Sequence, residues 1–302
     1  MIVYKDLKIK KNHKGSVIAI GNFDGLHLGH QKVLKEARKK AKKDKIKFGL
    51  ITFEPVPTMF FNKNIKNHRI NSMSQKIYFL KKNKLDFLII INFNESFSNL
   101  SAEDFIKKIL FEKLKCKYIF ISQNFRFGKK RLGDIKTLKN FEKKYAYKTL
   151  VTTPYKKQNK IVSSSLIRKI IQAGKIQEAE KLLGRPWTIE GEVIKGAQRG
   201  RVIGFPTCNI KLNSYALPKL GVYSVWVQIK DLKKRGIANI GYRPTFNGRS
   251  LLLEVNIFGI KKNLYNKILK INFIKFIRAE KKFKNINQLK TQIKKDIIAA
   301  KK

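Results

Sequence analysis

Short apolar runs alternate with longer amphipathic segments along the first half of the chain. Five runs rich in Val, Ile, Leu and Phe have the length of buried strands, and four segments have the spacing of amphipathic helices. Alternation of this kind predicts a mainly parallel sheet covered by helices. The expected strands are 16–21, 46–53, 86–92, 118–122 and 147–153, and the expected helices are 31–43, 73–82, 102–114 and 135–144.

After Pro186 the pattern changes to short aromatic or β-branched runs separated by turn residues. Such runs predict a compact antiparallel sheet or barrel. Two more helices are expected before the change, at 164–173 and 176–183, and an amphipathic helix at 286–300 closes the chain. The expected strands are 187–194, 221–229, 237–240, 251–257 and 268–276. We therefore predict two domains, residues 1–183 and residues 184–302.

Composition limits the class of protein. No apolar run approaches the roughly 20 residues that a membrane-spanning helix needs, and residues 1–11 lack the apolar segment of a signal peptide. The only cysteines, Cys116 and Cys208, are far apart and give no disulfide framework. We expect a cytoplasmic protein without a membrane partner, and no feature predicts an obligate protein partner.

The formal net charge of +48 is extreme and would favour polyanions. Only 12 of the 68 basic residues are arginine, however, and arginine is the side chain best suited to bidentate recognition of bases and phosphates. The lysines are scattered over both halves instead of forming one stripe. We therefore expect no specific nucleic-acid partner, although nonspecific adhesion to polyanions is an expected side effect.

Residues 21–30 read GNFDGLHLGH and stand where an expected strand passes into an expected helix. The first turn of a helix offers unpaired backbone N–H groups and the positive end of a dipole, so it attracts phosphate. Imidazoles there can add donors to phosphoryl oxygens whose charge grows during group transfer. Two surface histidines or a zinc site are the alternatives, but no nearby cysteine or carboxylate cluster completes a zinc ligand set. The motif favours a nucleotide site.

A second candidate phosphate element is SSSLIR at 163–168, which opens an expected helix. Serines at this position can simply cap the helix, whereas an arginine one turn later can reach an anion bound at the same terminus. Neither a P-loop string nor a Gly-x-Gly-x-x-Gly string occurs in the chain. Their absence argues against a P-loop enzyme and against a dinucleotide oxidoreductase.

The second half has a glycine-rich stretch with basic neighbours, GEVIKGAQRGRVIGFPTCN at 191–209. Such a stretch suits backbone wrapping of phosphates, and the side-chain oxygens of Thr207 and Asn209 are hard ligands suited to Mg²⁺. A plain hairpin loop explains the composition equally well. Glu254 is a lone acid in an apolar strand, either solvated on an outer face or a general base for a substrate hydroxyl.

Taken together and in order, these strings resemble the bifunctional bacterial riboflavin kinase/FAD synthetase family. The resemblance runs through almost the whole chain. It rests on GNFDGLHLGH (21–30), TFEP (52–55), NFRFGKKRLGD (124–134), SSSLIR (163–168), LLGRPW (182–187), GRVIGFPTCN (200–209), GVY (221–223), NIGYRPTF (239–246), LEVNIF (253–258) and IRAEKKF (277–283).

The resemblance implies an α/β nucleotidyltransferase-type, Rossmann-like domain with a parallel sheet, followed by a small antiparallel flavokinase β-barrel with a C-terminal helix. It implies that the second domain phosphorylates riboflavin with ATP to FMN, and that the first joins FMN and ATP into FAD with release of pyrophosphate. Mg²⁺ is the implied metal, ATP the co-substrate, and riboflavin, FMN and FAD the flavin ligands.

The resemblance also assigns residues to these reactions. Glu254, His27, His30 and Arg168 are the implied catalytic residues. The implied ATP and adenylyl site consists of Gly21, Asn22, Phe23, Asp24, Gly29, Ser163, Ser164 and Ser165. The implied flavin side of the first domain consists of Phe53, Pro55, Pro57, Asn124 and Arg126. The implied kinase site for Mg-ATP consists of Gly196, Gly204, Pro206, Thr207 and Asn209, with Thr207 and Asn209 as metal ligands.

Two other classes compete with this interpretation. One is a nucleotidyltransferase acting on a different acceptor, such as nicotinate mononucleotide or phosphopantetheine, but those enzymes have no flavokinase-like second domain. The other is a nonenzymatic nucleic-acid-binding protein that exploits the charge. Such binding should collapse steeply with salt, and it gives no reason for the ordered set of motifs.

Overall fold

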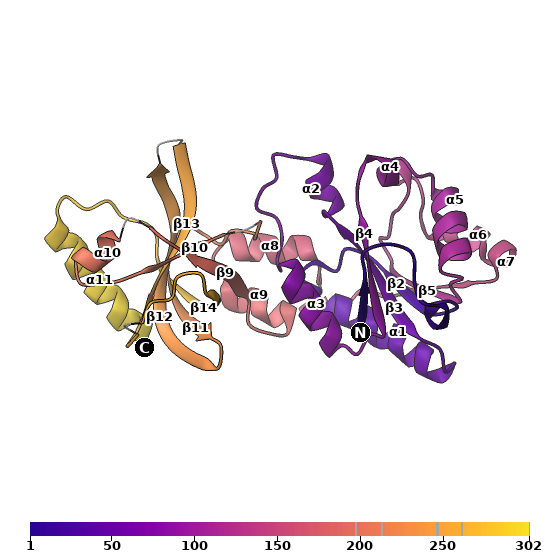
Figure 1. The fold of residues 1–302 in the computed structure, drawn as a ribbon, viewed down its shortest axis with the longest axis horizontal. Helices are drawn as coiled ribbons and strands as arrows, with labels where there is room; N and C mark the ends of the chain where they lie inside the picture. The colour runs from indigo at the N-terminus through magenta and orange to yellow at the C-terminus, as the bar shows by residue number, and fades with distance from the viewer. Residues whose placement is uncertain (197, 213, 246–247, 261, 302) are drawn as a thin grey trace. The chain divides into compact units, whose positions relative to one another are not determined.

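The computed structural model describes residues 1–196, 198–212, 214–245, 248–260 and 262–301. Phe246, the last residue of the NIGYRPTF string, and Ala197, within the glycine-rich stretch, lie outside the described residues. The chain forms two compact units, which Figure 1 shows as a ribbon. The first comprises Met1–Lys66 and Met73–Ser163, and the second comprises Asn67–Ser72 and Ser164–Lys302. The expected functional boundary at 183/184 stays a prediction.

The first unit is built on a parallel sheet of six strands in the order β1-β4-β3-β2-β5-β6. Every neighbouring pair is parallel. The strands are β1 (Ile2–Tyr4), β2 (Val17–Ile20), β3 (Phe48–Glu54), β4 (Phe87–Asn92), β5 (Tyr118–Ser122) and β6 (Lys148–Thr152). The five predicted strands are confirmed. The edge strand β1 was missed because three residues show too little of any period to predict an element.

Helices connect these strands, and most were predicted. They are α1 (Leu28–Lys43), α2 (Pro57–Phe61), α3 (Met73–Lys82), α4 (Glu95–Ser98), α5 (Ala102–Asp104), a π-helix (Phe105–Lys113), α6 (Ile135–Asn140) and α7 (Glu142–Tyr145). Short 3-10 turns lie at Lys11–His13, Asp24–Leu26 and Lys129–Arg131. The predicted helix 102–114 is helical, but most of it is π-helix. The predicted helix 135–144 is two helices, because the backbone at Phe141 leaves helical geometry.

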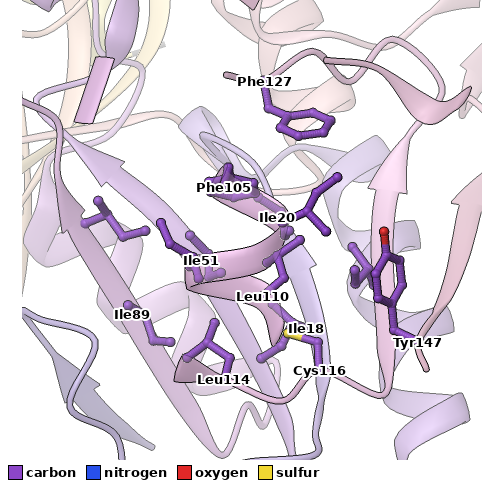
Figure 2. Close-up of a cluster of buried hydrophobic side chains, with 14 of the residues drawn as sticks. Ile18, Ile20, Ile51, Ile89, Phe105, Leu110, Leu114, Cys116, Phe127 and Tyr147 are labelled. Carbon is purple, nitrogen blue, oxygen red and sulfur yellow. The ribbon is translucent and has the colours of Figure 1, made fainter. Parts of the chain in front are cut away.

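The core of this unit lies on both faces of the sheet, since successive strand residues point to opposite sides. On one face, side chains of β2, β3 and β4 pack against the π-helix, and Figure 2 shows this cluster. Its labelled members include Ile18, Ile20, Ile51, Ile89, Phe105, Leu110 and Leu114. On the other face, Val17, Ala19, Leu50 and Leu88 pack against α1 through Val33, Leu34 and Ala37. Helices therefore cover both faces, as a parallel sheet requires.

The second unit contains two helices, a closed antiparallel barrel and a C-terminal helix. The barrel order is β10-β13-β12-β11-β14-β9. The helices are α8 (Ser164–Gln172), α9 (Ile176–Leu183), α10 (Arg199–Val202) and α11 (Ile286–Lys301). The strands are β9 (Thr188–Ile194), β10 (Cys208–Lys211), β11 (Gly221–Ile229), β12 (Leu232–Thr245), β13 (Gly248–Ile257) and β14 (Ile268–Arg278). A small hairpin, β7 (Lys156–Lys157) with β8 (Lys160–Ile161), belongs to the first unit.

The predicted barrel and its closing helix are confirmed, with two differences. Strand β10 was missed because only Ile210 in it is aliphatic, so the run shows no clear alternation. Strand β12 is much longer than the predicted 237–240, because its first half is polar and pairs with β11 by backbone hydrogen bonds. Polar positions on an outer face hide a strand from its hydrophobic pattern. No helix in the described residues is long and apolar enough to cross a membrane.

One short segment from early in the chain belongs to the second unit. Residues 67–72 pack there through backbone and side-chain hydrogen bonds. The indole Nε1 of Trp187 donates to the carbonyl of Ile70 at 3.1 Å, and Nη2 of Arg185 donates to Oδ1 of Asn71 at 2.8 Å. Burial lowers the pKa of Arg185 to about 10. Nothing in the local sequence predicted this pairing, because its partners are more than a hundred residues away.

Candidate active sites in the two units

The GNFDGLHLGH loop of the first unit follows β2 at the centre of the sheet. On one side of β2 the order runs to β3 and β4, and on the other side it continues with β5, so the order reverses here. In open parallel sheets the crevice beyond the carboxyl ends of the strands at such a switch point is where ligands bind. The sheet therefore places this loop where the sequence predicted a nucleotide site.

The two histidines lie side by side at the N-terminus of α1. Their ring centroids are 3.7 Å apart and the rings are nearly parallel. His27 is the N-cap of the helix, and its Nδ1 accepts the backbone N–H of His30 at 3.3 Å. A neutral imidazole that accepts at Nδ1 carries its proton on Nε2, so Nε2 of His27 is a donor. The dipole of a 16-residue helix adds positive potential at this end.

Gly29 allows two elements to approach the histidines closely. A Cβ on Gly29 would lie 3.1 Å from the ring of His27 and 3.2 Å from the carbonyl oxygen of Val162. Any side chain would therefore push apart the imidazole and the chain at 162. Because Ser163 follows Val162 directly, this contact brings the start of the SSSLIR string to the first turn of α1.

The loop itself has an unusual backbone. Phe23 and Leu26 have φ values of 46° and 39°, and Gly25 has a φ of 78°. A left-handed conformation in a non-glycine residue costs on the order of 1–3 kcal/mol and persists only where its surroundings fix it. Phe23 is buried, and its ring lies 5.0 Å from that of His30. Asp24 is also buried, whereas the side chain of Asn22 is exposed.

The remaining residues of the SSSLIR string open the second unit. Ser164 begins α8, and Ser165 and Arg168 follow on that helix. The Nε of Arg168 donates to the carbonyl of His68 at 2.8 Å, within the segment that joins the barrel. This hydrogen bond holds the guanidinium in one orientation, a feature that the sequence did not predict. The joint action of Arg168 and the two histidines stays a prediction.

The predicted flavin-side residues lie at the same carboxyl edge of the sheet. Phe53 is near the end of β3, Pro55 follows it, and Pro57 begins α2, a position that proline favours. Asn124 and Arg126 are exposed just after β5. Because all five follow strands of a parallel sheet or lie at their ends, one edge collects them.

Sequence reasoning missed an aromatic cluster at this edge. Its rings form a connected series with centroid separations between 5.2 and 6.2 Å. The members are Phe53, Phe60, Phe61, Phe93, Phe97, Phe105, Phe125 and Phe127. The available signal was the enrichment of phenylalanine directly after β3, β4 and β5. Phe53, Phe105 and Phe127 are buried in the core, whereas Phe61 is exposed and is suited to stacking against a planar ligand.

Arg126 is held in place by Asp134. Its Nη1 donates to Oδ2 of the carboxylate at 3.0 Å. Asp134 also caps α6, where it accepts the backbone N–H of Thr137. The hydrogen bonds from Thr137, with a smaller contribution from the charge of Arg126, lower the pKa of the Asp134 carboxyl. Asp134 therefore stays ionised and orients Arg126.

The second unit has a cavity of about 590 Å³ on the outer surface of the barrel. Its size lies within the range of small-molecule sites. Strands β12, β13 and β14, the loop before β10, and α11 contribute its lining. The polar lining consists of Thr207, Asn239, Glu254, Asn256, Arg278, Glu280, Lys281 and Asp296. Of these, only Thr207 and Glu254 had been given a role from the sequence.

Glu254 belongs to a row of polar side chains that crosses three strands. It pairs with Asn209 of β10 on one side and with Asn239 of β12 on the other. Directly opposed residues in a sheet point to the same face. The flanking residues Leu253 and Val255 are buried in the barrel, so Glu254 points outward. The row therefore brings a carboxylate and two amides to one outer face of the barrel, where Glu254 and Asn239 line the cavity.

Two glycines make room for the candidate metal ligands. A Cβ on Gly196 would lie 1.6 Å from Nδ2 of Asn209, and one on Gly200 would lie 3.2 Å from Oγ1 of Thr207. Oδ1 of Asn209 is buried and has no hydrogen-bond partner among the described residues. A buried acceptor in this state is costly unless a ligand satisfies it. Together with the exposed hydroxyl of Thr207, it fits a cation with oxygen ligands.

Gly204 and Pro206, the other predicted residues of this loop, are not closely packed. Gly204 has a φ of 89°, and no atom lies within 4 Å of a Cβ built there. It is therefore required for its backbone conformation and not for close packing. Pro206 is exposed, and its carbonyl accepts Nδ2 of Asn256 at 2.7 Å. This bond ties the loop to the strand that carries Glu254.

Replacing Gly196 by alanine is expected to impair the second unit selectively. The new methyl would displace the Asn209 amide, so the phosphotransfer expected of the second unit should fall by about tenfold or more. The rate of product formation from an alcohol acceptor and ATP measures the effect. The control is the nucleotidyl transfer expected of the first unit, measured on the same variant. An unchanged rate of phosphotransfer in Gly196→Ala would contradict the expected clash with Asn209.

A buried ion pair fixes the C-terminal helix over the cavity. Nε and Nη2 of Arg278 donate to Asp296, with distances between 2.7 and 3.0 Å. Asp296 is buried on α11, and Arg278 ends β14. The guanidinium fork and the carboxylate match in geometry. Removal of either partner would leave a buried charge unpaired, which typically costs 3–5 kcal/mol.

The fold and these two sites define an enzyme with a nucleotidyltransferase-type domain and a flavokinase-type barrel in one chain. A family described as FAD synthetase matches residues 9–166, and one described as riboflavin kinase matches residues 183–302. The chain belongs to these two families, joined in a single polypeptide.

Relatives that match over nearly their whole length support the same family assignment. The chain is 44% identical to a bifunctional riboflavin kinase/FMN adenylyltransferase of Buchnera aphidicola subsp. Schizaphis graminum, over 97% of this chain and 96% of the relative. It is 37% identical to the protein of the same name from Bacillus subtilis, over 95% and 92%. A crystal structure titled as a macrolide-efflux protein from Streptococcus pneumoniae aligns with 99% of this chain and 98% of its own, with a TM-score of 0.86 and 30% identity. The predicted fold class and family are confirmed.

Proposed function

We propose that this chain carries out two consecutive reactions: riboflavin and ATP give FMN and ADP, and FMN and a second ATP give FAD and pyrophosphate. The observation that supports this most strongly is that both domain families are present, in order, in one chain. A nucleotidyltransferase that acts on a different acceptor would have no need for the barrel and its cavity. A nonenzymatic nucleic-acid-binding protein would have no need for either candidate site.

In the first reaction the terminal ribityl hydroxyl of riboflavin attacks the γ-phosphorus of ATP. We assign Glu254 as the general base, because its carboxylate faces the cavity and an uncharged hydroxyl gains from proton removal. Thr207 and Asn209 would hold Mg²⁺, which supplies neutralisation of the phosphate charge when bound. Gly196, Gly204 and Pro206 would shape the loop around the phosphates. The remaining contribution is positioning.

In the second reaction a phosphate oxygen of FMN attacks the α-phosphorus of ATP, and pyrophosphate leaves. A phosphate monoester is largely ionised near neutral pH, so this step needs no general base. We assign His27, His30 and Arg168 to stabilise the charge that develops on the phosphoryl oxygens. Gly21, Asn22, Phe23, Asp24 and Gly29 would contribute the loop, and Ser163, Ser164 and Ser165 the start of the second phosphate element.

The flavin of FMN fits the aromatic edge of the first unit. Phe53 with its neighbouring phenylalanines offers apolar surface for the ring system, and Pro55 and Pro57 border it. Asn124 and Arg126 offer polar groups on the same edge. The relevant partners are thus riboflavin, FMN and ATP. A cytoplasmic location and the lack of a specific nucleic-acid, membrane or obligate protein partner stay predictions.

Product analysis tests the proposal directly. The purified protein is incubated with ATP and Mg²⁺, once with riboflavin and once with FMN, and the flavins are separated by chromatography. We expect FMN and then FAD from riboflavin, and FAD from FMN alone. Omitting Mg²⁺ should stop both reactions. Absence of any new flavin would overturn the proposed function, and FMN without FAD would restrict it to the barrel.

A further inference from the structure

Lys76 is a buried lysine that neither reaction has used. It lies on α3 of the first unit, and its side chain is only 2% exposed. Lysine is seldom buried to this extent without a specific partner. Its ammonium donates to the backbone carbonyl of Asn22 at 2.8 Å and to Oγ1 of Thr52 at 3.3 Å. Helix α3 therefore reaches the loop that follows β2.

Thr52 provides a second hydrogen bond to the carbonyl of Asn22. Its hydroxyl donates to the carbonyl of Asn22 at 3.0 Å, and the side chain is fully buried in β3. Two donors, one of them charged, thus converge on one backbone oxygen. A charge-assisted hydrogen bond is roughly twice as strong as a neutral one. The carbonyl of Asn22 is consequently held by donors from two elements, α3 and β3.

Fixing that carbonyl also fixes the next N–H. The peptide bond between Asn22 and Phe23 is not among the cis bonds of the described chain, so it is trans. In a planar trans peptide the C=O and the N–H point in opposite directions. With the carbonyl turned toward Lys76 and Thr52, the N–H of Phe23 points the other way, away from these two side chains.

The left-handed backbone at Phe23 needs these hydrogen bonds to the Asn22 carbonyl to persist. Its φ of 46° is left-handed, so this residue returns to extended backbone unless neighbouring contacts prevent it. Release of the Asn22 carbonyl would let the peptide rotate, and this orientation of the N–H would be lost. The buried ammonium also adds positive potential beneath a site proposed to bind polyphosphate.

We propose that Lys76 is a positioning residue for adenylyl transfer, which holds the Asn22 carbonyl so that the loop presents its N–H groups to the triphosphate of ATP. This inference rests on the proposed function of the first unit. Lys76 itself touches no reacting atom in this scheme and acts through the loop. Thr52 assists it through the second hydrogen bond.

The test compares Lys76→Met with the wild type. Methionine keeps the apolar stem and removes the ammonium. We expect kcat for FAD formation from FMN to fall by about 100-fold, as for the loss of a preorganised donor. The KM for ATP should change less, because the donors matter most for charge that grows in the transition state. The riboflavin kinase rate of the same molecules should stay within twofold.

Two further variants separate positioning from stability. Lys82→Met makes the same replacement at an exposed lysine of α3 and should leave FAD formation unchanged. Thr52→Val keeps the shape of the side chain and the charge of Lys76 but removes one donor, so kcat should fall by about three- to tenfold. If Lys76→Met does not fold, Thr52→Val alone decides the question. All rates are measured well below the melting temperature of each variant.

Two results would overturn the proposal. One is a Lys76→Met protein that folds and keeps its kcat for FAD formation within threefold of the wild type. The other is a Thr52→Val protein with unchanged kcat where Lys76→Met cannot be folded. Wild-type protein that makes no FAD from FMN would instead remove the proposed function of the first unit, and this proposal with it.

Discussion

Replacing Glu254 by glutamine is expected to stop FMN formation while FAD formation from added FMN continues. Glutamine keeps the size and hydrogen-bonding capacity of the side chain but cannot accept the proton of the riboflavin hydroxyl. Loss of a general base typically lowers a rate by about 10²- to 10⁴-fold. The measurement is the initial rate of FMN production at saturating riboflavin and ATP, with flavins separated by chromatography.

The row that contains Glu254 supplies a matched control. Asn239→Asp places a carboxylate beside position 254 on the neighbouring strand. The double variant Glu254→Gln/Asn239→Asp tests whether a carboxylate anywhere on this face is sufficient, and we expect it to remain inactive because the base must reach one hydroxyl. Undiminished FMN formation in Glu254→Gln alone would contradict the assignment of the base.

The second large effect is expected from the paired histidines. His30→Ala removes one imidazole from the N-terminus of α1, and FAD formation should fall by about 10²- to 10³-fold. Supplied with riboflavin, this variant should accumulate FMN, because the kinase step does not use the residue. The ratio of FMN to FAD over time measures the effect.

His27 needs a different replacement because it also caps α1. Asparagine is a good N-cap and accepts the backbone N–H that Nδ1 of His27 accepts now. His27→Asn should therefore keep the melting temperature of the protein and still lose FAD formation. If the activity survived in both histidine variants, the charge on the phosphoryl group would have to be stabilised by other residues.

Much of the fold could be predicted from local pattern. Apolar runs of strand length and helical spacing located strands β2 to β6 of the sheet, helices α1 and α3, and the closing helix α11. The errors occurred where the pattern was weak, as in the three residues of β1, or where a strand is polar on its outer face, as in the first half of β12. In these segments the hydrogen bonds to a neighbouring strand decide the structure, and the pattern of apolar and polar side chains does not reveal the strand.

The candidate sites divide in the same way. GNFDGLHLGH is contiguous, so strand, loop and helix start could be read directly from it. Lys76 was missed because its partner, Asn22, is 54 residues away in the sequence. The row of Asn209, Glu254 and Asn239 was missed as a row because strand order and register decide which residues face each other.

The sequence by itself therefore determined the two-domain order, the class of each domain and the contiguous motifs, since these depend on neighbours along the chain. The tertiary structure decided what depends on distant partners. It placed the motif loop at the reversal of strand order, fixed the Asn22 carbonyl with Lys76 and Thr52, and moved residues 67–72 into the second unit. Such contacts form only when burial brings remote segments together, and no local pattern encodes them.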